Sequence, residues 1–237
     1  MLGLKIHIRK DGISLDQQHF NKALLEQYGI NTCKTVITPL KHNQHLFTAT
    51  TNEAISLKKL KTSYRNVIGS INYLSTATRP DLLFANRGLY YPIQTSKTVT
   101  AFRNTDWGNF RVTRRSTTGY LTCFHQFPVF WNTLKKPYVS ISTEEAEYKS
   151  LCDLTSEFLW FKQWCEEERL LKLEKTILIY EDNQACIKTA DGDCNLNKKR
   201  LKHVDIQLQC IKEAIQKYLV CLRYIPSAHM LADFLTK

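Results

Sequence analysis

Short apolar runs separated by turn residues mark the start of the chain. Residues 2–8 and 13–15 flank Lys10-Asp11-Gly12, and two apolar runs around such a turn are typical of a β-hairpin. Apolar positions then recur at helical spacing within residues 17–28, and Gly29 follows where a left-handed cap would end a helix. The pattern predicts a hairpin followed by a short amphipathic helix.

The next segment alternates between polar loop and helix. Residues 42–62 are polar and carry little periodicity, which indicates a loop or linker. Residues 64–85 contain apolar positions at helical spacing and then Pro80, which predicts a helix that ends before the proline. Because residues 88–100 show no clear period, we place a domain boundary there.

From about residue 100 onward, the pattern changes to strands and then to alternating helices and strands. Short β-rich runs are followed by a long helix, for which Thr143 is the expected N-cap, and helix and strand then alternate to the end of the chain. This order predicts an α/β domain with a mixed sheet and helices packed on its faces. The expected strands are 119–124, 129–134, 176–180 and 219–225, and the expected helices are 143–170, 184–190, 199–217 and a final turn at 231–236.

Composition makes this an ordinary globular chain with an excess of positive charge. The 237 residues are 43% hydrophobic and 23% charged, and 33 Lys and Arg against 22 Asp and Glu give a formal charge of +11. Such a charge favours a polyanion such as nucleic acid, because bound phosphates release their counterions. A basic surface without a partner is the alternative, since net charge alone defines no site.

Cysteine usage and hydropathy point to the interior of the cell. The eight cysteines are scattered and form no Cys-x-x-Cys pair, which is typical of reduced thiols that fill a core. We find neither a signal-like apolar segment nor a run of about 18 apolar residues, so we expect an intracellular protein without a membrane partner.

Three carboxylates occupy positions where chemistry is expected. Glu147 heads a stripe on the long helix that continues through Leu151 and Leu154, and a buried carboxylate there needs a partner. Asp182 follows a predicted strand, at the edge where open α/β sheets place ligands. Asp233 lies near the end. Each has an ordinary alternative: Glu147 as a solvated helix-start acid, and Asp182 as an N-cap.

Together with their neighbours, these acids resemble the ribonuclease H domain of copia-class (Ty1/copia) retrotransposon Pol polyproteins. The shared strings occur in the family's order over about 135 residues, which makes chance similarity very improbable, and an integrase-type nuclease, although it shares the broad architecture, fits them less well. The strings are Arg114–Tyr120, Trp131, Ser142–Tyr148, Tyr180–Ala185 and Leu231–Lys237.

The resemblance continues upstream into the end of the reverse transcriptase. Thr38-Pro39-Leu40 and Tyr64–Ser70 look like the family's polymerase end and connection segment, although fewer residues than usual separate Ala85 from Asn104, as if part had been deleted. The polymerase's own Tyr-x-Asp-Asp hairpin is absent, so no polymerisation is expected. The resemblance implies a small α+β reverse transcriptase remnant at 1–40, a partly deleted connection segment at 41–99 and a ribonuclease H-like domain at 100–237.

By resemblance, the last domain would cleave RNA in RNA–DNA hybrids with two divalent ions, Mg²⁺ or Mn²⁺, held about 4 Å apart by four carboxylates. Glu147, Asp182 and Asp233 match three of these metal-binding positions. The fourth position holds Asn104, whose neutral amide lacks the charge that draws two dications together. Asp106 is a candidate substitute, but two residues along a strand is about 6.6 Å, so turnover is expected to fall severely.

A basic run starts the second long helix and is the candidate nucleic-acid contact. The resemblance leaves three alternatives: an impaired hybrid ribonuclease, a non-catalytic nucleic-acid-binding remnant, or a fragment without function. Expected partners are an RNA–DNA hybrid or other nucleic acid and further Pol segments, in the cytoplasm, a virus-like particle or the nucleus. The residues of the run are Lys198, Lys199, Arg200, Lys202 and His203, and solvated lysines at a helix start are their ordinary alternative.

Overall fold

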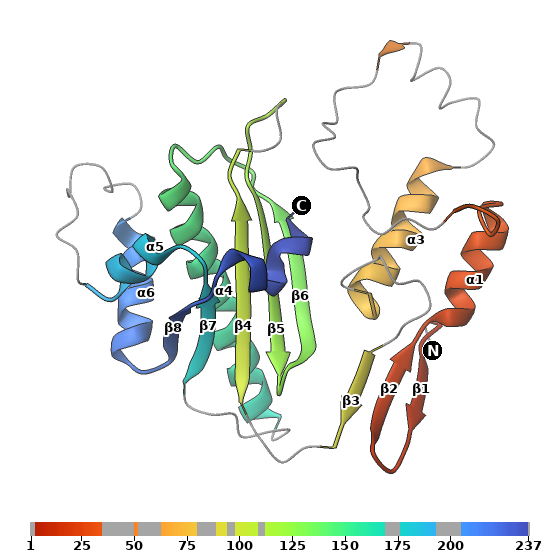
Figure 1. Cartoon of the computed structure of the whole chain (residues 1–237), viewed down its shortest axis with the longest axis horizontal. Helices are drawn as coiled ribbons and strands as arrows, with labels where there is room; N and C mark the ends of the chain where they lie inside the picture. Colours follow the sequence, from red (N-terminus) through yellow and green to blue (C-terminus); the bar gives the residue numbers. More distant parts are fainter. Residues whose placement is uncertain are drawn as a thin grey trace. The chain divides into compact units, whose positions relative to one another are not determined.

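The structure is a computed structural model in which the chain divides into two compact units (Figure 1). The first unit is Met1–Gln94 and the second is Thr95–Lys237. The structure describes residues 3–34, 50–51, 63–79, 89–93, 98–108, 112–168, 176–192 and 205–236.

The first unit contains a three-stranded antiparallel sheet. β1 (Lys5–Ile8) pairs with β2 (Gly12–Asp16), so the predicted hairpin is confirmed. β2 also pairs with β3 (Leu89–Pro92), a strand that the sequence pattern did not predict. Its partner lies more than seventy residues earlier in the chain, and its four residues are too few to show a period.

Two helices complete the described part of this unit. α1 (Gln18–Gln27) is followed by Gly29 with a φ of 65°, which confirms both the helix and its glycine stop. α3 (Tyr64–Ala77) confirms the second predicted helix. The two helices touch through Phe20 and Tyr73, whose rings meet edge to face with centroids 5.3 Å apart. The predicted loop at 42–62 lies outside the described residues except for 50–51.

A five-stranded mixed sheet forms the centre of the second unit, with strand order β6-β5-β4-β7-β8. β4 (Val99–Asp106) pairs antiparallel with β5 (Thr117–Phe124), which pairs antiparallel with β6 (Phe127–Lys135). β7 (Ile177–Glu181) runs parallel to β4, and β8 (Val220–Tyr224) runs parallel to β7. An antiparallel meander extended by parallel strands, with helices packed on the sheet, is the mixed-sheet α/β arrangement that the sequence pattern predicts for this part of the chain, so this fold class is confirmed.

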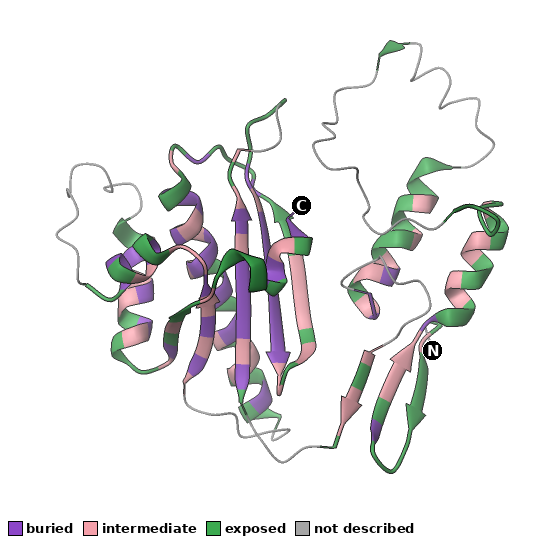
Figure 2. Ribbon diagram, viewed as in Figure 1, coloured by how far each residue is buried: buried purple, intermediate pink, exposed green. Residues whose placement is uncertain are grey.

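Three helices pack in the core on one face of this sheet. They are α4 (Thr143–Glu167), α5 (Gln184–Ala190) and α6 (Asp205–Gln216). The apolar stripe on α4 is buried at Leu151, Leu154 and Phe158, as its spacing predicts (Figure 2). The predicted N-cap Thr143 was wrong by one residue, because the Ser142 side chain accepts the hydrogen bond from the Glu145 backbone N–H and Thr143 already lies in the helix.

The opposite face of the sheet is covered by the last residues of the chain. The 3₁₀-helix η2 (Leu231–Leu235) packs on β4 and β5, and it buries Ala232 and Leu235 against Phe102 and Leu121. Gly119 on β5 makes this close approach possible, since a Cβ built there would lie 2.5 Å from the Leu235 Cβ. The predicted terminal helical turn is confirmed, and its position on the sheet places Asp233 beside β4.

We predict that Gly119→Ala loosens η2 from the sheet. The added methyl group has no space beside Leu235, and overpacking of this kind costs about 1–3 kcal/mol of unfolding free energy. Thermal melting followed by circular dichroism should show a lower Tm. Gly69→Ala in α3, where nothing lies within 4 Å of the new Cβ, is the matched control and is expected to leave the Tm unchanged or slightly raised. An equal response of both variants would contradict the role assigned to Gly119.

Candidate functional site

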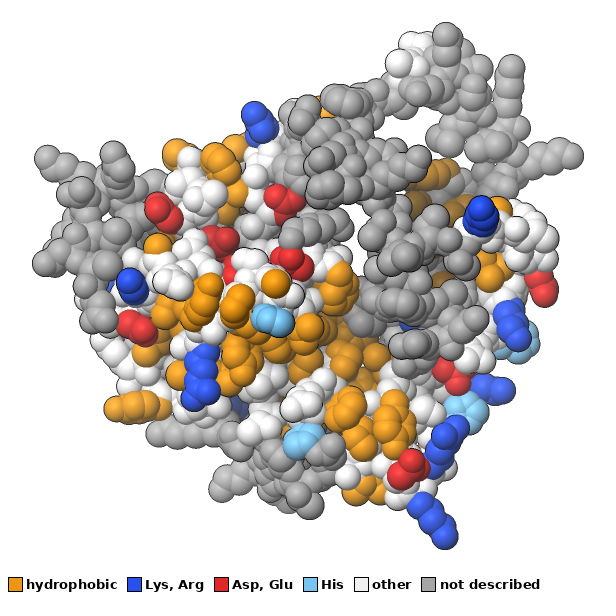
Figure 3. Space-filling view, viewed as in Figure 1, with side chains coloured by type: hydrophobic (Ala, Val, Ile, Leu, Met, Phe, Trp, Pro, Cys, Tyr) orange, Lys and Arg blue, Asp and Glu red, His pale blue; other side chains and the backbone are white. Residues whose placement is uncertain are grey.

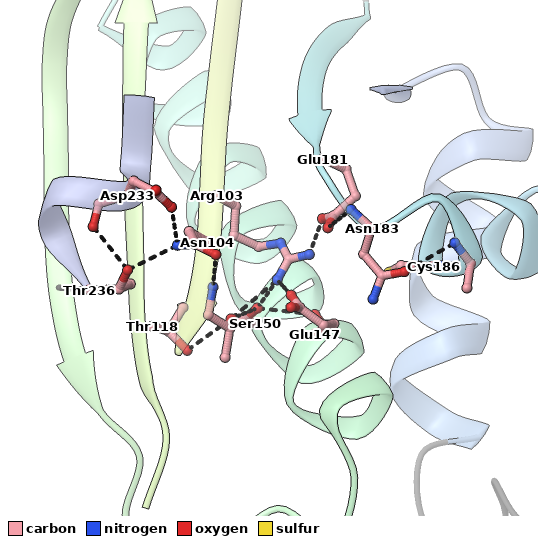
Figure 4. Close-up of polar contacts among 12 residues, drawn as sticks. Arg103, Asn104, Thr118, Glu147, Ser150, Glu181, Asn183, Cys186, Asp233 and Thr236 are labelled. Atoms are coloured by element: carbon pink, nitrogen blue, oxygen red, sulfur yellow. Dashed lines mark hydrogen bonds and ion pairs between the residues drawn. The ribbon is translucent and has the colours of Figure 1, made fainter. Parts of the chain in front are cut away.

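A buried arginine is the centre of the polar cluster at the end of the sheet (Figure 4). Arg103 lies on β4 on the same face as Val99 and Ala101, which point into the core under α4. The neighbouring parallel strand pairs Tyr180 with Phe102, so the next residue of each strand, Glu181 and Arg103, faces the same side. The register of two strands thus brings the guanidinium to the Glu181 carboxylate.

α4 supplies the second acid of this cluster. Glu147 lies in the first turns of the helix and forms an ion pair with Arg103, and the Ser150 hydroxyl accepts a hydrogen bond from the guanidinium at 2.5 Å. The side chains of Arg103 and Glu181 are fully buried, and that of Glu147 is 12% exposed. Burial of these charges is tolerated because each carboxylate meets the guanidinium directly.

Asn104 points to the other face of β4. Its side-chain nitrogen donates hydrogen bonds to the Asp233 carboxylate at 2.5 Å and to the Thr236 hydroxyl at 3.0 Å. Its side-chain oxygen accepts from the backbone N–H of Thr105 at 2.8 Å, which fixes the orientation of the amide. The amide nitrogen therefore faces Asp233, and the amide oxygen is already engaged elsewhere.

Asp182 lies just after β7, and its partner belongs neither to the Arg103 cluster nor to the Asn104 contact. Its carboxylate accepts a hydrogen bond from the Ser227 hydroxyl at 2.8 Å. It does not cap α5, because the Asn183 side chain accepts from the backbone N–H groups of Ala185 and Cys186.

Burial raises the pKa of the Cys186 thiol to about 12, although the nearby Arg103 guanidinium acts in the opposite direction. Cys186 is thus a protonated core residue.

The predicted acids are therefore distributed over separate contacts. Glu147 pairs with Arg103, Asp182 with Ser227 and Asp233 with Asn104. Asp106 lies two residues beyond Asn104 on β4 and is partly buried. The basic run at 198–203 lies outside the described residues.

The arrangement does not fit the two ions that the resemblance implies. Within the part of the chain that the structure describes, no group of three or more His, Cys, Asp and Glu side chains is placed to hold a metal ion. The geometry gives the reason. A carboxylate that pairs with a guanidinium and another that accepts from an amide N–H have N–H donors where an ion would need open oxygen ligands.

Sequence reasoning missed two residues of the cluster, Arg103 and Glu181. The sequence contained a signal for Arg103, because this residue follows Val99 and Ala101 at alternate positions of one strand. All three side chains therefore lie on the same, buried face. An arginine in such a position requires an acidic partner within the core. Glu181, which ends the apolar alternation of the neighbouring strand, is the residue that meets this requirement.

Comparison with known proteins gives relatives along the whole chain, although no family model matches. The Pol polyprotein of transposon RE1 from Arabidopsis thaliana is 25% identical over 268 residues, which cover 100% of this chain and 18% of the relative. That of transposon TNT 1-94 from Nicotiana tabacum is 25% identical over 272 residues, covering 100% and 20%. Both alignments exceed the 237 residues of this chain, so these relatives carry residues that it lacks.

A solved structure is similar to part of this chain. Ribonuclease H1 from the halophilic archaeon Halobacterium salinarum is 14% identical, with a TM-score of 0.43 over 57% of this chain and 90% of that protein. The chain spans about a fifth of the length of the curated relatives named above. Among the residues that the structure describes, no helix is long and apolar enough to cross a membrane.

We predict that Asn104→Asp lowers stability when no divalent ion is present. The new carboxylate would face Asp233 across the 2.5 Å contact that the amide N–H now makes, and two like charges at that distance repel. The cost should be about 1–3 kcal/mol at neutral pH and should shrink as the pH falls towards about 4, where carboxyl groups take up protons.

Urea unfolding in EDTA at several pH values measures this difference in unfolding free energy. Asn183→Asp is the matched control, because Asn183 caps α5 with its side-chain oxygen and an aspartate can do the same. A loss at Asn104 no larger than that at Asn183 would argue against the contact with Asp233.

Proposed function

We propose, from the homology of this chain to the Pol polyproteins of copia-type transposons, that its second unit is a degenerate ribonuclease H-like module. Its ancestral activity is the metal-dependent cleavage of RNA in RNA–DNA hybrids, and that activity is impaired in this chain. The proposal rests on a confirmed fold, on the order of the matching motifs and on the chemistry of the acidic positions. In this proposal, the first unit is a remnant of a reverse transcriptase together with its connection segment.

The observation that carries the proposal is the contact between Asn104 and Asp233. Two-metal cleavage needs anionic oxygen ligands that hold both ions, because the ions neutralise the charge that develops on the attacking and leaving oxygens. Here an N–H donor satisfies the Asp233 carboxylate, and the amide oxygen of Asn104 binds the backbone of Thr105. The contact between Asn104 and Asp233 is therefore complete without an ion.

We predict that the unaltered protein cleaves an RNA–DNA hybrid no faster than a Glu147→Gln variant in either Mg²⁺ or Mn²⁺. Asn104→Asp combined with Arg103→Ser is expected to raise cleavage above that level, because the first change restores an anionic ligand beside Asp233 and the second frees Glu147 from its ion pair. A gel assay with a labelled RNA strand measures both rates. Asn183→Asp, which changes the same chemical group outside the β4 contact, controls for contaminating nuclease.

Cleavage by the unaltered protein that requires a divalent ion and disappears in Glu147→Gln would refute the proposed impairment. Measurable cleavage at the same rate by the unaltered protein, Glu147→Gln and Asn183→Asp would indicate a contaminating nuclease, and the comparison is then repeated after a second purification step.

A second candidate function is non-catalytic binding of nucleic acid, which the formal charge of +11 favours. On the face shown in Figure 3, the described Lys and Arg side chains are scattered, and acidic side chains lie among them. The basic run at 198–203 is the densest group of like charges in the sequence of the second unit, so we propose that it makes the main phosphate contacts.

We predict that affinity for a hybrid falls by about tenfold or more when salt rises from about 50 to 200 mM, because neutralised phosphates release counterions. Fluorescence anisotropy with a labelled hybrid measures the dependence. Removing four charges from the basic run should weaken binding and flatten the salt dependence more than removing four exposed charges from the first unit. The two sets are Lys198, Lys199, Arg200 and Lys202, and Lys5, Arg9, Lys10 and Lys22, each changed to Ala. An affinity that does not change with salt would exclude phosphate-driven binding.

A further inference from the structure

The Arg103 guanidinium lies between the two carboxylates of its cluster as a shared cation. It forms ion pairs with Glu147 of α4 and Glu181 of β7, and it donates hydrogen bonds to Ser150 and, at 3.2 Å, to Thr105. The Ser150 and Thr105 hydroxyls lie 2.8 Å apart and complete the polar group. Oxygen atoms from two strands and one helix thus surround a single positive charge (Figure 4).

Electrostatics makes this cation necessary in the folded state. Glu181 is fully buried and Glu147 nearly so, and two carboxylates close together in a core repel each other and lose their hydration. A guanidinium keeps its charge at any ordinary pH, and its planar fork of N–H donors can reach both acids at once. Either a bound cation or a basic side chain can meet this need, and the sequence supplies the side chain.

We propose that Arg103 is a built-in cation that takes the place of a divalent ion at this end of the sheet. It neutralises Glu147 and Glu181 and thereby makes the fold independent of metal. It also withholds Glu147 from metal binding, so the acidic site is disabled at two adjacent residues of β4, Arg103 and Asn104. The inference rests on the proposed function for its account of the site, but its tests need no nucleic acid.

The first test compares the melting of the whole chain with and without Arg103. Arg103→Met keeps an unbranched apolar side chain but leaves two carboxylates without a cation, and removing one partner of a buried ion pair lowers the Tm by about 10 °C or more. Lys136→Met is the matched control. Lys136, which directly follows β6, is also buried, but its partner Asp153 is half exposed. Only a small shift of the Tm is therefore expected.

A second variant separates charge from packing. Arg103→Met combined with Glu147→Gln and Glu181→Gln removes the unpaired charges and is expected to recover most of the lost Tm, or to fold where the single variant does not. A single variant that melts with the unaltered protein would overturn the proposal. So would a triple variant no more stable than the single one, because Arg103 would then act through its volume.

Manganese binding tests the exchange of one cation for another. Mn²⁺ titrated into the protein and followed by electron paramagnetic resonance is expected to stay free with the unaltered chain. Arg103→Ser, which vacates the space between the carboxylates, is expected to bind the ion and to lose that binding when Glu147→Gln is added. Binding by the unaltered protein that depends on Glu147, or no binding by Arg103→Ser, would overturn the proposal.

The two sets of experiments can fail independently. Metal-dependent cleavage by the unaltered protein would refute the proposed impairment, whereas the melting comparison would still report whether Arg103 holds the two acids together. Conversely, an inactive protein whose stability does not depend on Arg103 would keep the proposed function and lose this inference.

Discussion

Compensation of buried charge is the constraint on which the second unit depends. Arg103, Glu181 and Glu147 come from β4, β7 and α4, and none of them could be buried without the others. Their pairing is direct only when β7 lies beside β4 in its observed register and the first turns of α4 lie over β4. A one-residue slip of either strand would place the acid and the base on opposite faces. The ion pairs therefore select the register that the apolar core stabilises.

The two faces of β4 explain why the expected metal ligands do not converge. Consecutive residues of a strand point to opposite sides. Arg103 therefore binds the acids under α4, while Asn104 donates a hydrogen bond to Asp233 on the side of η2. Each residue offers N–H donors to a carboxylate. The strand that would be expected to bring an anionic ligand to the ions instead brings a cation and an amide, and each acid is satisfied locally.

Much of this architecture is encoded in local patterns, and the exceptions have physical causes. The stripe on α4 and the β-rich runs of β5 and β6 predict elements that the structure contains, because burial of one helix face imposes a period and β-branched and aromatic residues favour strands. β3 escaped prediction since only its pairing with β2 defines it, and pairing over such a separation leaves no local signal. The cap moved from Thr143 to Ser142 because both residues are able to cap, and only the hydrogen bond distinguishes them.

The candidate site shows the same division between what a motif predicts and what contacts determine. The matching strings correctly indicated the relatives and the α/β fold, and they grouped Asn104 with Asp233, which the structure brings into contact. They did not reveal Arg103, because a motif compares positions one at a time, whereas the charge balance of a site is a property of all its members. An amide at position 104 alone would leave Glu147 available to an ion. An amide next to a buried arginine does not, so the loss of a metal site that we propose is a change in the electrostatics of the whole strand.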